Sequence, residues 1–417
     1  MTGTESRETP PREPTSSMPT VTMIGGGQLA RMTHQAAIAL GQTLRVLAAG
    51  PDDPAAAVSA DVVIGDHSDL DDLRVAARGS DAFTFDHEQV PTEHLDVLVA
   101  EGVNVQPPPT ALIYAQDKLR MREKLRSLSI PVPAFAEVTS VADVTDFGSA
   151  HGWPVVLKAI RGGYDGRGVW MLDDADQARE TVEQQLAAGV PLLVEQKVDM
   201  ARELSAMVAR SPFGQGATWP VVETVQRRGQ CAVAIAPAPG LSDDTAADAE
   251  HLALRIASEL GVVGVMAVEL FETPTGRLLV NELAMRPHNS GHWSMDGART
   301  SQFEQHLRAV LDYPLGDCAP LAPVTVMANV LGAPTAPTMS MDERVHHLFA
   351  RMPDAKVHLY GKGERADRKI GHVNVLGAAS GSANDAEYVA AVRERAERAA
   401  HWLSHAEWTD GWDHHDG

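Results

Sequence analysis

An α/β fold is predicted for this chain by three observations. Apolar, strand-like stretches alternate with stretches of helical periodicity along most of its 417 residues. The apolar stretch 21–24 runs through glycines 25–27 into a helical pattern that lasts to Gly41, which is the outline of a phosphate-binding unit. A second apolar stretch, 154–158, is followed by four glycines within 162–168. The length favours two to four domains, with room for an active site between them.

The N-terminal region is predicted to form a Rossmann-like domain over residues 19–109, after a disordered tail at 1–18. Further strands are expected at 43–48, 62–64 and 82–85, with a helix at 69–78. Asp52 follows the second strand, close to where a dinucleotide fold places its ribose-binding acid. One alternative is therefore an oxidoreductase that binds NAD at residues 25–30, although such a glycine pattern alone is a weak signal.

A proline-rich break at 107–109 precedes a second domain, predicted over residues 110–313. Its expected elements are an amphipathic helix at 110–127, strands at 154–159, 168–172 and 192–196, and helices at 175–188 and 246–260. A small, strand-rich C-terminal domain is predicted over 314–404, and residues 405–417 are expected to form a flexible tail. The expected elements of that domain are a strand at 325–330 and a polar helix at 341–351.

The glycine-rich segment 162–168 is predicted to cover a nucleotide triphosphate. Its glycines free the backbone of Cβ obstruction, so that N–H groups can close over an anion that Lys158 holds from the preceding strand. The segment lacks the Gly-Lys-Ser/Thr of a Walker loop, which favours a loop between two strands. The alternative is a glycine-rich hairpin turn that binds nothing.

Two glutamates are predicted to meet on one face of a hairpin. The expected strands of that hairpin are 262–272 and 277–283. In the register that the intervening turn suggests, Glu269 faces Val280 and lies diagonally across from Glu282. Two carboxylates so close are costly without a cation, and hard oxygen donors suit Mg²⁺ held together with phosphate oxygens. Asn281 points to the other face of an ideal strand, so a ligand role for it requires a local distortion. The alternative is a pair of solvated glutamates.

Two basic clusters stand out in a chain that carries a formal net charge of −21. Arg286, His288 and Asn289 follow the second glutamate and offer donors for a small oxyanion beside a transferred phosphate. The second cluster consists of Lys362, Arg365, Arg368 and Lys369. It lies in a glycine-containing loop and would suit an anionic substrate, with an ordinary solvated loop as the alternative.

The composition excludes several classes of function. With 44% hydrophobic and 22% charged residues it is typical of a globular protein, and no apolar run approaches the roughly 18 residues that cross a bilayer. The acidic balance disfavours non-specific binding to nucleic acid. Two cysteines, without metal-binding spacing, argue against a disulfide framework or structural zinc and fit a reducing cytoplasm.

Five segments together resemble the N5-carboxyaminoimidazole ribonucleotide synthetase family of the ATP-grasp superfamily. They are 25–32, 162–168, 281–282, 286–293 and 368–374, in the order and at the spacing of the family. The resemblance implies an ATP-grasp fold with an N-terminal pre-ATP-grasp domain. It further implies a ligase of purine biosynthesis that carboxylates 5-aminoimidazole ribonucleotide with bicarbonate and ATP, through carboxyphosphate.

The resemblance also implies roles for individual residues. ATP would be bound by Lys118, Lys158, Gly163, Tyr164, Asp165, Gly166, Arg167, Gly168, Val169, Glu195, Gln196, Lys197, Val198, Glu203, Asn281 and Glu282. The ribonucleotide would be bound by Gln28, Tyr164, Asp165, Arg167, Lys362, Arg365 and Arg368. Bicarbonate would be positioned by Arg286, His288 and Asn289, and Mg²⁺, or Mn²⁺ in its place, would be held by Glu269 and Glu282. The relatives imply a homodimer and functional coupling to the downstream mutase.

One segment departs from the family pattern. Residues 85–91 follow its acidic-aromatic motif only loosely, so no substrate role is assigned to Glu88. Two other functions stay open: another ATP-grasp ligase, such as a formate-dependent glycinamide ribonucleotide transformylase or a biotin carboxylase, and a non-catalytic module that senses ATP. The segment 288–292 and the short C-terminal domain disfavour another ATP-grasp ligase. The additional cluster of anion-binding residues disfavours a module that only senses ATP.

Overall fold

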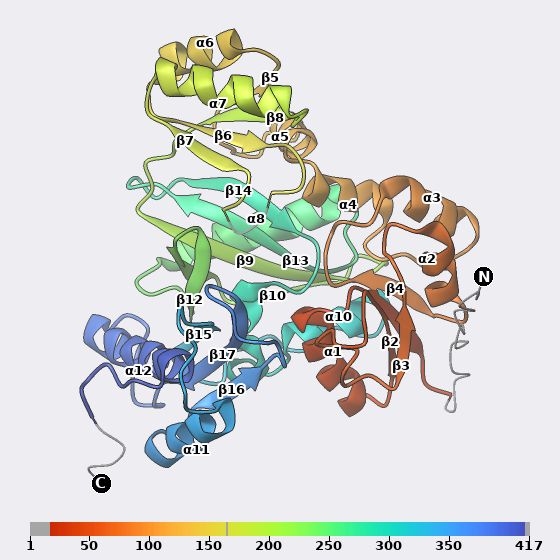
Figure 1. Cartoon of the computed structure of the whole chain (residues 1–417), viewed down its shortest axis with the longest axis vertical. Helices are drawn as coiled ribbons and strands as arrows, with labels where there is room; N and C mark the ends of the chain where they lie inside the picture. Colours follow the sequence, from red (N-terminus) through yellow and green to blue (C-terminus); the bar gives the residue numbers. More distant parts are fainter. Residues whose placement is uncertain (1–16, 164–165, 413–417) are drawn as a thin grey trace, which may run out of the picture.

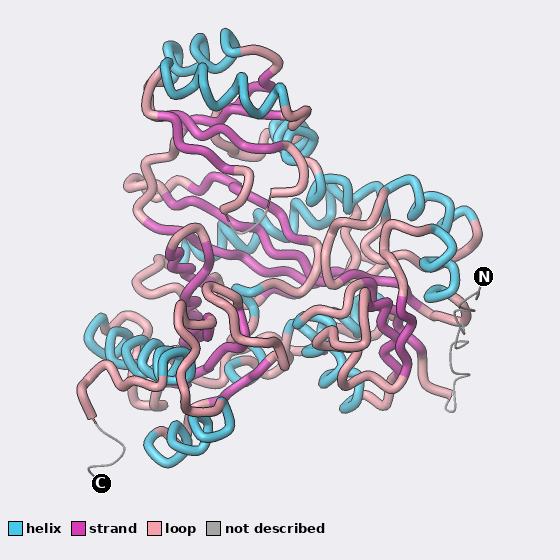
Figure 2. The backbone as a smooth tube through the Cα atoms, viewed as in Figure 1, coloured by secondary structure: helices cyan, strands magenta, loops and turns pink. Residues whose placement is uncertain are grey.

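The computed structural model of the chain, shown in Figure 1, describes residues 17–163 and 166–412. It confirms the predicted α/β fold, because helices pack against a parallel four-stranded sheet, an antiparallel four-stranded sheet and an antiparallel nine-stranded sheet. In Figure 2 the nine-stranded sheet runs through the middle of the molecule, with the small antiparallel sheet above it and the parallel sheet to the right. Active-site groups from all three sheets can therefore meet near the centre.

The N-terminal unit is the parallel sheet, with strand order β3-β2-β1-β4. Its elements are β1 (Thr20–Ile24), α1 (Gln28–Ala39), β2 (Thr43–Ala48), β3 (Asp61–Ile64), α2 (Leu70–Ala77), β4 (Ala82–Phe85) and α3 (Thr92–Ala100). Strand β1 is buried along its whole length, as expected of a central parallel strand. Gly25, at φ +105°, then turns the chain into α1, a backbone conformation that glycine adopts without strain.

The small antiparallel sheet has the order β5-β8-β6-β7. The elements of this part are α4 (Pro109–Gln116), α5 (Lys118–Ser127), β5 (Phe135–Val138), α6 (Val141–His151), β6 (Val155–Ala159), β7 (Val169–Leu172), α7 (Ala175–Ala187) and β8 (Leu192–Gln196). Helices α6 and α7 cover its outer face in Figure 1. The glycine-rich segment connects β6 to β7, so the predicted loop between two strands is confirmed.

The long sheet has the order β14-β13-β9-β11-β12-β15-β17-β16, with β10 beside β9. Its first part contains β9 (Arg202–Arg210), β10 (Gly216–Thr218), β11 (Val222–Arg227), β12 (Gln230–Ala236), α8 (Asp243–Leu260), β13 (Gly264–Glu272) and β14 (Leu278–Ala284). After β14 come a 3₁₀ turn, η1 (Asn289–Gly291), and two helices, α9 (Ser294–Gly297) and α10 (Gln302–Val310). Helix α8 begins at the N-cap Ser242 and ends at Gly261, whose φ of +68° suits a helix terminus.

The C-terminal strands continue the long sheet, because β12 pairs with β15. The elements are β15 (Thr325–Leu331), α11 (Met341–Arg351), β16 (Lys356–Leu359), β17 (Lys369–Leu376) and α12 (Ala386–His405). The segment expected as a flexible tail from residue 405 is packed as far as Trp412. The Trp408 ring is buried and stacks on Trp402 with centroids 4.5 Å apart, and Arg351 lies over Trp408. Residues 413–417, and residues 1–16 of the expected N-terminal tail, lie outside the described ranges.

The helix predicted at 110–127 is interrupted. Asp117 leaves helical geometry, with φ −131° and ψ 103°, and its carboxylate accepts the backbone N–H of Arg120, which makes it the N-cap of α5. The other carboxylate oxygen accepts from Arg161, and the backbone N–H of Lys118 donates to Ile160. The break therefore ties the first turn of α5, with Lys118, to the base of the glycine-rich loop.

None of the helices within 17–163 and 166–412 combines the length and the apolar character that a membrane span requires.

Candidate active site

The two glutamates of the predicted metal site lie directly opposite each other. A β-bulge beside Glu269 shifts the register of β13 and β14, so that Glu269 faces Glu282. The predicted register, in which Glu269 faces Val280, is wrong for two reasons: Glu272 pairs with Leu278 and not with Arg277, and the bulge then adds Asn281 to β14. The bulge also supplies the distortion that a ligand role of Asn281 requires, since Asn281 and Glu282 are consecutive and both half-buried.

Each of these glutamates lies beside a basic side chain. The Nζ of Lys118 lies 2.5 Å from Glu282 Oε1, and the Nε2 of His288 lies 3.1 Å from Glu269 Oε1. Burial acts to raise the pKa of Glu269, but the hydrogen bond and charge of His288 and the charge of Lys118 lower it overall. Glu269 therefore stays ionised at neutral pH.

Two opposed carboxylates beside the predicted phosphate-binding lysines fit Mg²⁺, which prefers oxygen ligands and commonly binds through one or two carboxylates plus substrate phosphates. In the described part of the chain no group of three or more His, Cys, Asp or Glu side chains could hold a metal ion. Phosphate oxygens and water would therefore have to complete the coordination.

Lys158 is fixed by a buried group of three charges. Its Nζ lies 2.7 Å from Glu195 Oε2 and donates to Asn281 Oδ1 at 3.2 Å, while Arg122 Nε lies 2.6 Å from the other Glu195 oxygen. Burial lowers the pKa of Lys158, and the charge of Glu195 offsets part of that shift. Because both Glu195 oxygens contact cations, a contact with adenine would have to come from its main chain. Arg122, which is 1% exposed, was not predicted.

Arg286 is oriented by Glu88. The Nε of Arg286 donates to Glu88 Oε2 at 2.7 Å, and the backbone N–H of Met285 donates to the other Glu88 oxygen at 3.2 Å. The segment around Glu88 matched the family pattern only loosely, and sequence reasoning gave Glu88 no role. Its place beside Arg286 shows that it fixes a predicted oxyanion-binding side chain.

The first glycine turn holds a carboxylate of the protein itself. Asp86 accepts hydrogen bonds from the backbone N–H groups of Gly27 at 3.0 Å and Ala30 at 2.8 Å. A Cβ at Gly27 would lie only 2.2 Å from Asp86 Oδ2, so glycine is required there. Burial raises the pKa of Asp86 to about 6. Because Asp86 fills the anion-binding turn, the structure disfavours the alternative of NAD at residues 25–30.

His288 and Asn289 are each held by further polar groups. His288 Nδ1 lies 2.8 Å from Ser290 Oγ, which in turn lies 2.7 Å from Ser205 Oγ. The side-chain amides of Asn289 and Asn329 donate to each other's oxygens, at 3.1 and 2.8 Å. Both predicted oxyanion-binding residues are therefore fixed before any ligand arrives.

Many of these groups line one cavity of about 700 Å³, although Lys158, Glu195 and Asn281 are not among its lining residues. The predicted residues that line it are Gln28, Lys118, Gly163, Glu269, Glu282, Arg286, His288 and Asn289. Glu88 and His292, which were assigned no role, also line it, as does Lys369 of the second basic cluster. Lys118, the two opposed carboxylates and the predicted oxyanion donors thus share one space, which is the arrangement that phosphoryl transfer to a small oxyanion needs.

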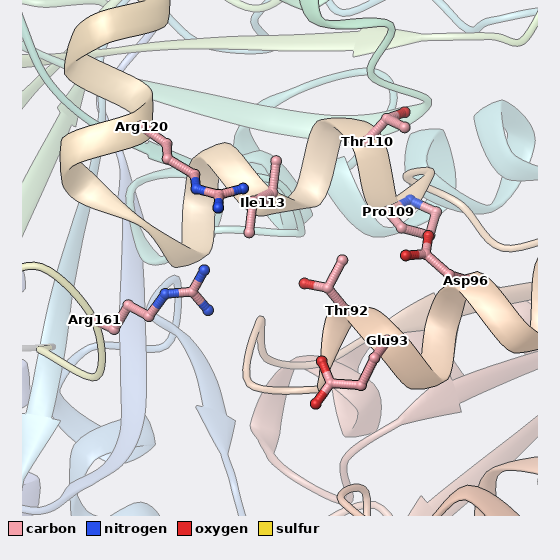
Figure 3. Close-up of a pocket in the computed structure, with 8 residues that line it drawn as sticks. All are labelled: Thr92, Glu93, Asp96, Pro109, Thr110, Ile113, Arg120 and Arg161. Carbon is pink, nitrogen blue, oxygen red and sulfur yellow. The ribbon is translucent and has the colours of Figure 1, made fainter.

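A smaller cavity of about 340 Å³, shown in Figure 3, adjoins the first one. The guanidinium groups of Arg120 and Arg161 lie on one side of it, facing Thr92 and Glu93 of α3. Both arginines contact Asp117, at 3.8 and 3.0 Å. The mixture of charges in this space favours neither an anion nor a cation.

The remaining predicted ATP-binding residues either do not line the cavity or lie outside the described residues. Tyr164 and Asp165 lie outside the described residues. Gly166, Arg167 and Val169 are exposed and Gly168 is half-buried, all on the loop or the start of β7. Gln196 ends β8 and is exposed like Lys197, and Val198 is half-buried. Glu203 on β9 is half-buried, and burial raises its pKa. None of these described residues lines the cavity.

The predicted ribonucleotide-binding residues divide into two groups. The Nζ of Lys362 donates to the side-chain oxygen of Gln28, which lines the cavity. Arg365 is exposed, and Arg368 donates to the backbone oxygen of Gly363 at 3.2 Å. Neither arginine lines the cavity.

Comparison with known protein families covers most of the chain. Residues 18–116 match the ribonucleotide synthetase preATP-grasp domain, residues 123–303 the ATP-grasp domain, and residues 325–386 the phosphoribosylaminoimidazole carboxylase C-terminal domain. These three models account for the three parts of the fold in chain order.

Individual proteins give the same result. The chain is 64% identical, over 407 residues, to an N5-carboxyaminoimidazole ribonucleotide synthase of Mycobacterium leprae (strain TN), covering 95% of this chain and 92% of the relative. It is similar to the crystal structure of N5-carboxyaminoimidazole ribonucleotide synthetase from Thermus thermophilus, at 34% identity and a TM-score of 0.79, covering 94% and 100% of the two chains.

A third similar structure contains ligands. It is N5-carboxyaminoimidazole synthase from Aspergillus clavatus in complex with ADP and 5-aminoimidazole ribonucleotide, at 29% identity and a TM-score of 0.80, covering 91% and 99% of the two chains. Taken with the opposed glutamates and the oxyanion donors of the cavity, these similarities confirm the resemblance found in the sequence. The chain belongs to the N5-carboxyaminoimidazole ribonucleotide synthase family and is an ATP-grasp ligase.

Proposed function

We propose that this protein carboxylates 5-aminoimidazole ribonucleotide with bicarbonate and ATP, giving the N5-carboxyamino product, ADP and phosphate in purine biosynthesis. The observation that carries the proposal is the cavity in which Lys118, Glu269 and Glu282 face Arg286 and His288. A site that only sensed ATP would not need the second set of anion-binding groups.

Bicarbonate is a poor electrophile at carbon, which explains the need for ATP. Attack of a bicarbonate oxygen on the γ-phosphorus would form carboxyphosphate and release ADP. The amine of the ribonucleotide would then attack the carbon of carboxyphosphate, or of CO₂ released from it, and phosphate would leave. The protein supplies no covalent nucleophile in this scheme, so its contribution is positioning and neutralisation of charge.

ATP would lie between the small antiparallel sheet and the long sheet. Lys118 and Lys158 would contact its phosphates under the glycine-rich loop, and residues 195–198 with Glu203 would surround adenine and ribose. Glu195 supports this arrangement indirectly, because it holds Lys158 beside Asn281.

Glu269 and Glu282, with Asn281, would hold Mg²⁺, or Mn²⁺ in its place. The ion would supply positive charge to the transferred phosphoryl group. Lys118 and His288, which contact the two glutamates, would be free to contact ATP and bicarbonate once the ion binds the carboxylates instead.

Bicarbonate would be held by Arg286, His288 and Asn289. Arg286 offers a delocalised cation, and its position is fixed by Glu88. The ribonucleotide would lie near Gln28 and Lys362, with Tyr164, Asp165, Arg167, Arg365 and Arg368 as further proposed contacts. The charge of the second basic cluster fits the phosphate of this substrate.

Three further properties are part of the proposal. We propose a homodimer and functional coupling to the downstream mutase, which the family resemblance implies. The small number of cysteines fits a cytoplasmic location.

The direct test is ADP release from the purified protein with Mg-ATP, 5-aminoimidazole ribonucleotide and bicarbonate, omitting each component in turn. We expect release that requires all of them, with stoichiometric carboxylated product. Release that ignores the ribonucleotide would contradict the proposed acceptor and redirect the search to another ATP-grasp substrate.

Glu282→Gln tests the metal site. The variant should lose turnover, because the amide removes half of the negative charge facing the ion, while its unfolding transition should stay near that of the wild type. Glu259→Gln, on the exposed side of α8, is the matched control and should keep full activity. Normal Mg²⁺-dependent turnover in Glu282→Gln would remove Glu282 from the metal site.

A further inference from the structure

Asn329 lies on β15, in the C-terminal part of the long sheet, and is 7% exposed. It is far from the oxyanion-binding segment in sequence, yet its side chain pairs with that of Asn289 in the cavity wall. The backbone pairing of β15 does not require this contact, because an apolar residue at position 329 would leave the strand pairing unchanged.

The orientation of the Asn329 amide is set by a group that can only accept. Its Nδ2 donates to the backbone oxygen of Cys231 on β12 at 2.7 Å. A side-chain oxygen in that place would face another oxygen and lose the hydrogen bond. The nitrogen of Asn329 must therefore point towards Cys231.

That orientation passes to Asn289. With its nitrogen fixed, Asn329 donates to Asn289 Oδ1 at 2.8 Å and accepts from Asn289 Nδ2 at 3.1 Å through its own oxygen. A flipped Asn289 would place oxygen against oxygen and nitrogen against nitrogen. One N–H of Asn289 stays outside this pair, on a residue that lines the cavity with Arg286 and His288.

We propose that Asn329 is a positioning residue that holds the Asn289 amide with its remaining N–H available to the one-carbon oxyanion. The inference rests on the proposed function, in which Asn289 contacts bicarbonate. It gives the C-terminal strand β15 a part in catalysis, because the orientation is set by Asn329 together with the backbone of β12, and neither strand carries a predicted substrate-binding residue.

The test is a double-mutant cycle with Asn289→Ala and Asn329→Ala, measuring KM separately for bicarbonate, ATP and the ribonucleotide. Asn329→Ala should raise the bicarbonate KM about tenfold or more, because a misplaced donor to an anion loses most of its effect, and leave the other two values within about twofold. In the Asn289→Ala background the same substitution should have almost no further effect on the bicarbonate KM.

Two variants guard against a purely structural explanation. Thr325→Val changes another buried side chain of β15 and should leave all three KM values unchanged. Asn329→Asp keeps the volume of the side chain, but its carboxylate cannot donate to Cys231 or Asn289. It should therefore raise the bicarbonate KM at least as much as Asn329→Ala does. If the alanine variant fails to fold, Asn329→Asp takes its place in the cycle.

An unchanged bicarbonate KM, an equal rise in all three KM values, or additive effects in the cycle would overturn the role of Asn329. A wild-type protein whose ADP release does not depend on bicarbonate would instead overturn the proposed function, and the inference with it. The wild-type measurement thus separates the two failures.

Discussion

Replacing Glu195 with glutamine should destabilise the small antiparallel sheet and loosen Lys158. The carboxylate contacts Arg122 at 2.6 Å and Lys158 at 2.7 Å, and the side chains of Glu195 and Arg122 are almost completely buried. Glutamine keeps the shape of the side chain but leaves two buried cations without an anion. Removing one partner of a buried ion pair is costly for that reason.

The size of the effect follows from the pKa of Glu195. Burial acts to raise it, but the charges of Lys158 and Arg122 and their hydrogen bonds lower it overall, from 4.5 to about 2. At about 1.4 kcal/mol per pKa unit, the difference corresponds to roughly 3 kcal/mol of stability. Loss of one partner from other buried pairs typically costs about 3–5 kcal/mol, which is the same range.

The pH dependence has a definite sign. Because the folded-state pKa of Glu195 lies below the unfolded value, its contribution is fully present above about pH 4.5 and disappears as the pH falls towards about 2. The difference between wild type and Glu195→Gln should therefore be largest near neutral pH and shrink in acid.

Hydrogen exchange of the β6 and β8 amides measures the opening of this sheet separately from the rest of the chain. Glu195→Gln should lower the opening free energy by about 3 kcal/mol and raise the KM for ATP. The control is Glu137→Gln, at an exposed position on the neighbouring strand β5. It should change the opening free energy of the sheet by less than about 0.5 kcal/mol. Equal effects of the two substitutions would refute the reasoning.

Three further predictions concern other parts of the molecule. Burial lowers the pKa of His306 to about 4, so the unfolded chain binds a proton more readily than the folded protein does. Between pH 8 and pH 5, the free energy of unfolding in urea should therefore fall by about 2 kcal/mol more for the wild type than for His306→Gln, and equal losses would contradict this. Lys362→Ala should raise the ribonucleotide KM more than the ATP KM in steady-state assays, and more than the exposed Arg365→Ala does; equal effects on both substrates would remove Lys362 from that site. Trp408 stacks on Trp402 of α12, so Trp408→Ala should lower the opening free energy of α12, measured by hydrogen exchange, by about 3 kcal/mol. Unchanged exchange of the α12 amides would show that the segment after residue 405 does not stabilise the helix.

Local patterns predicted most elements of the fold. The strands of the parallel sheet were placed within a residue or two, because apolar runs and glycine turns are local signals. The helix at 110–127 was predicted as continuous because Asp117 is compatible with a helix, and its role as an N-cap depends on contacts with Arg161 and Ile160. The tail from 405 looked disordered because its packing partners, Arg351 and Trp402, lie elsewhere in the chain.

The missed residues of the site have a common cause. Arg122, Glu88 and Asn329 do not belong to any short motif, and each acts on a residue far away in sequence: Glu195, Arg286 and Asn289. One signal was available for Arg122. It is next to Met121 and three residues before Leu125, on the buried side of its helix, where an arginine needs an anionic partner.

The bulge in β14 shows how a local irregularity can serve the chemistry. In a regular strand, consecutive side chains point to opposite faces, so only one of Asn281 and Glu282 could face the cavity. Because the bulge adds Asn281, Lys158 reaches Asn281 while Lys118 reaches Glu282, and Glu282 faces Glu269 across the hairpin. An alternation pattern cannot reveal such a position. The pair Asn281-Glu282 was therefore recognisable from its resemblance to the family, while its geometry required the structure.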